Sequence, residues 1–70
     1  MRQRVITLDC GSRQLMAARD EIRALNGVVA AEAVTGKCAL RVWQGDELSE
    51  QALGDAVLRS GAARFTIRQA

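Results

Sequence analysis

The feature that most constrains this fold is the order in which helix-like and strand-like patterns alternate along only 70 residues. Residues 4–8, RVITL, are rich in β-branched and apolar side chains, as strands are. A helix is expected next, because apolar residues then recur at spacings of three and four. These residues are Leu15, Ala18, Ile22 and Leu25. Ser12 is a candidate N-cap for this helix, and Asn26 and Gly27 end it.

A hairpin is predicted after this helix. The segment VVAAEAV, residues 28–34, leads through a turn at residues 35–37, TGK, into the strand CALRVW, residues 38–43. Within this strand Cys38 shares a face with Leu40 and Val42. We therefore expect Cys38 to be a small buried side chain, since unpaired cysteine is among the most buried residue types.

A second helix and a fourth strand complete the chain. Ser49 is a plausible N-cap, Gly61 ends the helix, and the inner stripe consists of Leu53, Ala56 and Val57. The final strand is ARFTI, residues 63–67. With right-handed crossovers this order gives an α+β, ferredoxin-like βαββαβ fold, in which two helices cover one face of a four-stranded antiparallel sheet. Arg and Thr residues should then populate the uncovered face.

Composition narrows the class of protein. The chain has the length of one domain, residues 1–70, and its only aromatic residues are Trp43 and Phe65, so Ala, Val, Leu and Ile must form the core. No apolar run could cross a bilayer and no signal peptide is visible, so we expect a cytoplasmic protein without a membrane partner. The charge of +2 is dispersed and the central strands lack base-stacking aromatics, which argues against nucleic-acid binding. Histidine is absent, so imidazole ligands and bases are excluded.

The stretches LNGVVAAEAVTGKCALRV and SEQALGDAVLRSGA together resemble heavy-metal-associated domains, the small modules of copper chaperones and metal transporters. The matching positions are Leu25, Gly27, Val28, Gly36, Lys37, Leu40, Ser49, Leu53, Ala56, Val57 and Gly61. The resemblance implies the same ferredoxin-like fold. It also implies a Met-x-Cys-x-x-Cys metal loop after the first strand, where two soft thiolates at a helix N-terminus suit Cu(I).

The loop of this chain departs from that motif in either alignment. If Cys10 occupies the first cysteine position, Leu8 replaces the methionine and Arg13 replaces the second cysteine. If the helix is aligned without a gap, the two cysteine positions fall on Gly11 and Gln14. We favour the second alignment because it keeps the apolar helix stripe continuous.

Cys38 is not expected to replace the missing thiolate. We place the second hairpin at the opposite end of the sheet from the first loop, about 17 Å away for a strand of five residues. A disulfide needs Cα atoms within about 7 Å, so neither a disulfide nor a shared metal is expected between Cys10 and Cys38.

Two hypotheses remain, and under neither is the protein an enzyme. In the first, Cys10 binds a soft metal such as Cu(I), with a thiol from a partner protein or a second copy, in a loop formed with Asp9, Gly11, Ser12, Arg13 and Gln14. In the second, the domain binds no metal and contacts a partner through the uncovered sheet face. An alternative contact surface is the end that we expect the first loop, Trp43 and the turn at residues 61–62 to form. Thiol chemistry at Cys10 lacks a base or a resolving thiol.

Overall fold

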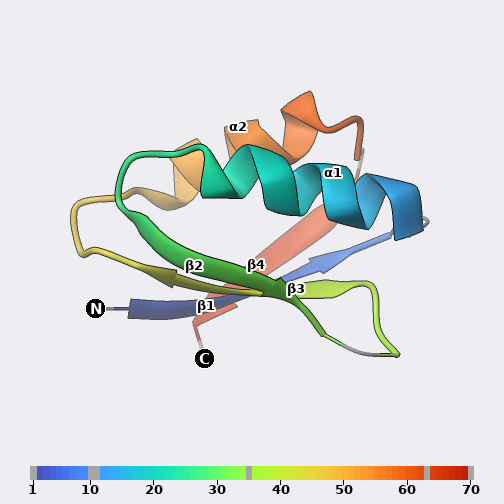
Figure 1. Cartoon of the computed structure of the whole chain (residues 1–70), viewed down its shortest axis with the longest axis horizontal. Helices are drawn as coiled ribbons and strands as arrows, with labels where there is room; N and C mark the ends of the chain where they lie inside the picture. The colour runs from blue at the N-terminus through green and yellow to red at the C-terminus, as the bar shows by residue number, and fades with distance from the viewer. Residues whose placement is uncertain (1, 10–11, 35, 63, 70) are drawn as a thin grey trace.

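Figure 1 shows the computed structural model of the chain, which describes residues 2–9, 12–34, 36–62 and 64–69. Its elements in order are β1 (Arg2–Leu8), α1 (Ser12–Arg23), β2 (Val28–Ala33), β3 (Ala39–Gln44), α2 (Glu50–Arg59) and β4 (Phe65–Gln69). The strands form one sheet in the order β2-β3-β1-β4, and all neighbouring strands are antiparallel. Both helices lie on the same face of the sheet (Figure 1). The predicted ferredoxin-like fold is confirmed.

The core lies between the helices and the sheet, and it is aliphatic as the composition predicts. Its buried members are Ile6, Leu8, Leu15, Ala18, Ile22, Ala31, Leu40, Val42, Leu53, Ala56, Val57 and Ala62. The predicted helix stripes supply six of these residues, while Leu25 is only partly buried because α1 ends at Arg23. Among the described residues no helix is long and apolar enough to span a membrane.

The ends of α2 follow from individual residues. The Ser49 side chain accepts a hydrogen bond from the Ala52 N–H at 3.2 Å, so the predicted N-cap is confirmed. After the C-cap, Gly61 has a φ of +96°, the left-handed conformation that commonly closes a helix. Gly54 lies inside the helix, where an added Cβ would meet the ring of Phe65 at 3.4 Å. This glycine therefore marks a close approach between α2 and β4.

The expectation that Cys38 is buried is wrong. β3 begins at Ala39, one residue later than predicted, and Cys38 is exposed. Alternation assigns Cys38 to a face of the sheet, but burial also requires a covering group, and the end of the strand lacks enough cover.

The face of the sheet opposite the helices carries the polar residues expected there. One cross-strand row consists of Glu32, Arg41, Val5 and Arg68, and Thr7 and Thr66 pair in the next row. Of these six residues only Val5 is partly buried, and the buried residue Ala39 also pairs with Thr7 in the second row. The prediction of an Arg- and Thr-containing open face is confirmed.

Candidate functional site

Three connections of the chain meet at one end of the sheet. At the end of β1 the Leu8 N–H donates to the Cys38 carbonyl at 2.7 Å, and the Asp9 N–H donates to the Arg64 carbonyl at 3.1 Å. The segment before α1, the β2–β3 hairpin and the α2–β4 connection therefore lie together, at the right of Figure 1. We call this region the loop end, and its described residues are Asp9, Ser12, Arg13, Gln14, Gly36, Lys37, Cys38, Gly61, Ala62 and Arg64.

This arrangement overturns the expectation that the second hairpin lies far from the first loop. β1 and β2 are both antiparallel to β3, so β1 and β2 run in the same direction and end at the same edge. Thr7 faces Ala39 in the β1–β3 register, and the Leu8 bond to Cys38 continues this ladder by one residue. The backbone of Cys38 is thus next to the end of β1, and the predicted strand-length separation is wrong.

The predicted loop residues divide into two groups. Cys10 and Gly11, which include the predicted metal ligand, lie outside the described residues. Asp9, Arg13 and Gln14 are exposed, and Ser12 is the first residue of α1. The Gln14 side-chain amide donates to the Gly61 carbonyl at 3.5 Å, which links the start of α1 to the end of α2.

Positive charge predominates among the described side chains of the loop end. Arg13, Lys37 and Arg64 are exposed here, against one exposed carboxylate, Asp9. The first turn of α1 contains no acidic residue, so the partial positive charge of the helix N-terminus is not offset within that turn. Within the described ranges no three side chains of the types Cys, His, Asp and Glu are grouped so that they could hold a metal ion. The region therefore favours an anionic group.

Trp43 lies elsewhere. It pairs with Gln3 near the start of β1 and with Ala30 of β2, so it belongs to the open face toward the opposite end of the sheet. Its side chain is partly exposed. The expectation that Trp43, the first loop and the turn at residues 61–62 form one surface is wrong, because four residues of β1 lie between Gln3 and Leu8.

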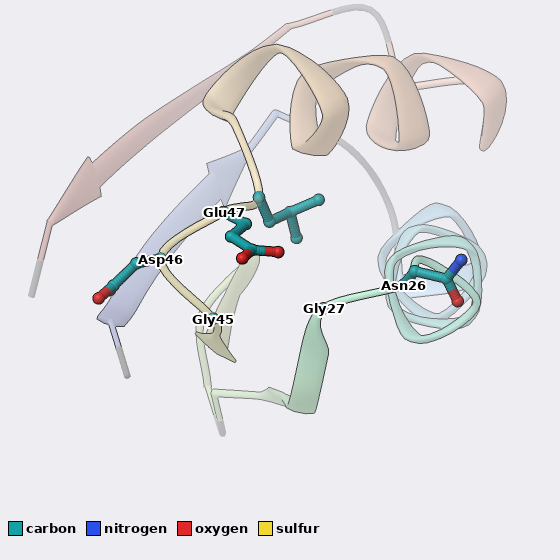
Figure 2. Close-up of a pocket in the computed structure, with 6 residues that line it drawn as sticks. Asn26, Gly27, Gly45, Asp46 and Glu47 are labelled. Carbon is teal, nitrogen blue, oxygen red and sulfur yellow. The ribbon is translucent and has the colours of Figure 1, made fainter.

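A hollow of about 600 Å³ is present at that opposite end. It is lined by Asn26, Gly27, Gly45, Asp46, Glu47 and Leu48 (Figure 2). The carboxylates of Asp46 and Glu47 point in different directions, and Asp46 is within 3.3 Å of the Arg2 guanidinium. These side chains do not converge on a common point, so the hollow is a poor cation site.

Two buried polar side chains were not anticipated. Arg4 is 4% exposed and forms an ion pair with Glu50 at the start of α2. Gln44 is fully buried, and its amide donates to the Leu48 carbonyl at 2.6 Å. A signal was available for Arg4, since it lies two residues before the buried residue Ile6 and therefore on the same face of β1. Both side chains fix the β3–α2 connection rather than the loop end.

No protein-family profile matches the chain, and no curated protein sequence is significantly similar to it. Solved structures are similar in fold. The yeast copper transporter domain Ccc2a, studied in apo and Cu(I)-loaded states, superimposes with a TM-score of 0.84 at 16% identity over the whole of both chains. A chain of the Atx1–Cu(I)–Ccc2a complex gives 0.77 at 16% identity, again over both whole chains. The N-terminal domain of ZntA in its apo form gives 0.67 at 17% identity, covering 99% of this chain and 92% of that one. At such identities the likeness establishes the fold alone, which this chain shares with these domains.

Proposed function

We propose that this domain is a soft-metal binding module of the metal-trafficking type, in which Cys10 is a ligand for Cu(I) or a similar thiophilic ion. The observation that carries the proposal is that Cys10 directly follows Asp9 at the loop end, a region of net positive charge. Thiolates are the ligands that Cu(I) prefers, and positive surroundings favour the deprotonated sulfur that binds a metal. The whole-chain likeness to domains solved with Cu(I) supports the same assignment.

The proposal is tested by competition for Cu(I) under reducing conditions. The purified, reduced protein is titrated with Cu(I) against a coloured chelator, beside the variant Cys10→Ser. We expect the wild type to withdraw Cu(I) from the chelator and Cys10→Ser to lose most of this capacity. If the wild type does not compete, or Cys10→Ser competes equally, the proposed function is wrong.

A second candidate function is a metal-free interaction domain that uses the open sheet face. The observation that favours it is that Trp43 is partly exposed there, while Val29 on the edge strand β2 is 65% exposed. Exposed aromatic and aliphatic groups on a face without helix cover are typical of contact surfaces.

Affinity capture with the folded domain as bait distinguishes this candidate. A partner that is lost with Trp43→Ala and kept with Cys10→Ser would locate the contact on the open face. Recovery of the same partner by both variants would exclude Trp43 from the contact. Circular dichroism of Trp43→Ala must accompany the capture experiment to show that the variant is folded. The Trp43 side chain is partly buried, so its removal also destabilises the domain through lost packing contacts.

A further inference from the structure

We propose that the chain forms a symmetric dimer through β4, in which the free edge of one sheet pairs with the same edge of a second copy. The sheet order β2-β3-β1-β4 leaves two edges, one on β2 and one on β4. An edge strand exposes backbone N–H and C=O groups that can pair with another strand. The two edges of this sheet differ in how they are protected against such pairing.

The edge formed by β2 is protected by a side chain and a bulge. In the ladder with β3 the Val34 N–H donates to the Ala39 carbonyl at 2.9 Å. Hydrogen-bonded and non-hydrogen-bonded pairs alternate in an antiparallel ladder, so the N–H and C=O groups of Ala31 point outward. The Arg23 Nε–H, from α1, donates to this outward Ala31 carbonyl at 3.1 Å. The ladder is also irregular near the start of β2. Both features hinder pairing with another strand.

The edge formed by β4 lacks this protection among the described residues. The Asp9 N–H donates to the Arg64 carbonyl at 3.1 Å, which fixes the alternation of the β1–β4 ladder. The N–H and C=O groups of Phe65, Ile67 and Gln69 therefore point outward, away from β1. No hydrogen bond in the described part of the chain uses these outward groups. The whole of β4, five residues long, is thus open to a further strand.

The sequence of β4 is complementary to itself in one register. With the two-fold axis at Ile67, Thr66 of each copy lies opposite Arg68 of the other, and Phe65 lies opposite Gln69. Every residue of the strand is then paired, and each outward residue exchanges both backbone hydrogen bonds with its opposite residue. The two sheets continue into one another, with all the helices on the same face.

The neighbouring symmetric registers are disfavoured by charge. An axis at Arg68 sets the Arg68 side chains of the two copies against each other, and an axis at Thr66 sets Arg68 against Arg64. Like charges directly opposite each other destabilise a strand pair. Both registers also leave part of β4 unpaired. The register centred on Ile67 is therefore the one that we propose.

Apolar side chains at the same edge favour a second copy as the occupant. Phe65 and Ile67 contact the core but are only partly buried, so part of their apolar surface faces water in the single chain. At the two-fold axis the two Ile67 side chains would cover each other. The edges that remain after pairing are those of β2, where Arg23 covers the backbone, so the assembly should stop at two chains. Because the two β4 strands run antiparallel, the loop ends point in opposite directions and the contact does not join them.

The test is the molecular mass as a function of concentration, measured by analytical ultracentrifugation of the whole chain in reducing buffer without metal. We expect a reversible change from monomer to dimer between about 1 μM and 1 mM, because a contact between edge strands is small. Gln69→Pro should raise the dissociation constant by about tenfold or more, since each copy loses an outward N–H that the single chain does not use. Gln69→Ala is the matched control, because it keeps this N–H and should dimerise like the wild type.

A pair of charge variants tests the register. Thr66 is exposed and would lie opposite Arg68 of the second copy. Thr66→Glu should therefore strengthen the dimer and Thr66→Lys should weaken it. We expect each to change the dissociation constant by about 2- to 30-fold, the combined effect of two symmetric cross-strand pairs. Circular dichroism of each variant checks that the fold is kept.

The outcomes are independent of the proposed function, because neither a metal nor Cys10 takes part. A wild type that stays monomeric throughout this range would overturn the dimer, in favour of an edge that is left free or binds an extended segment of another protein. A dimer that is unchanged by Gln69→Pro would overturn the contact through β4. Equal dimerisation of Thr66→Glu and Thr66→Lys would overturn the register centred on Ile67.

Discussion

Replacement of Gly54 by alanine should stabilise the domain. Gly54 lies in the middle of α2, where glycine costs about 0.8–1.0 kcal/mol relative to alanine. The added Cβ would lie 3.4 Å from Cζ and 3.5 Å from Cε2 of Phe65, which are ordinary contact distances. No overpacking cost is expected, so the free energy of unfolding should rise by about 1 kcal/mol. For a domain of this size that corresponds to a rise in melting temperature of about 4–8 °C.

Gly61→Ala is the matched control for this prediction. Gly61 has a φ of +96°, and the left-handed region costs other residues roughly 1–2 kcal/mol, so the same chemical change should destabilise here. Urea unfolding and thermal melts followed by circular dichroism measure both variants. A loss of stability in Gly54→Ala would refute the contact argument and indicate that α2 approaches β4 too closely for a methyl group. Equal effects of the two variants would refute the conformational argument.

Two further predictions concern polar contacts of α2. Ser49→Ala should lower the free energy of unfolding by about 1 kcal/mol and Ser49→Asp should preserve it, because the Ala52 N–H needs an acceptor; equal stability of the two variants in urea would contradict this. Arg4→Met should change stability by less than Glu50→Gln, because methionine removes a buried charge whereas glutamine leaves the guanidinium without its carboxylate. Glu50 is 58% exposed, so we expect a loss of about 1–2 kcal/mol for Glu50→Gln, and a greater loss for Arg4→Met in the same urea assay would contradict the reasoning.

Much of the fold could be predicted because periodicity and helix-ending residues agree along the chain. The spacing of Leu53, Ala56 and Val57 identified a helix face that is fully buried, and Ser49 and Gly61 marked its two ends correctly. These signals are local, so they can be read without knowledge of distant contacts. They also give the order of the helices and strands, which restricts the topology of the sheet.

Burial was less predictable because it depends on groups that are distant in the sequence. Alternation on β1 places Arg4 on the same face as Ile6, but its ion pair with Glu50 joins residues 46 positions apart. Alternation likewise assigned Cys38 to the face of Leu40, and only the three-dimensional structure shows that the strand end is uncovered. The two-residue alternation of a strand predicts which face of the sheet a residue occupies. It does not predict which groups cover that face.

The position of the hairpin is a different kind of error, because strand directions alone could have corrected it. A hairpin makes β2 antiparallel to β3, and a β-α-β crossover makes β1 and β2 run in the same direction, so the end of β1 and the β2–β3 turn must share one edge of the sheet. The spacing of cysteines along the chain suggested a loop that lacks a ligand. The topology brings the end of β1 next to the backbone of Cys38, as the 2.7 Å hydrogen bond from the Leu8 N–H to the Cys38 carbonyl shows. Where several strands end at the same edge of a sheet, residues that are distant in the sequence become neighbours. The residues of a site therefore have to be sought from the sheet topology as well as from motif spacing.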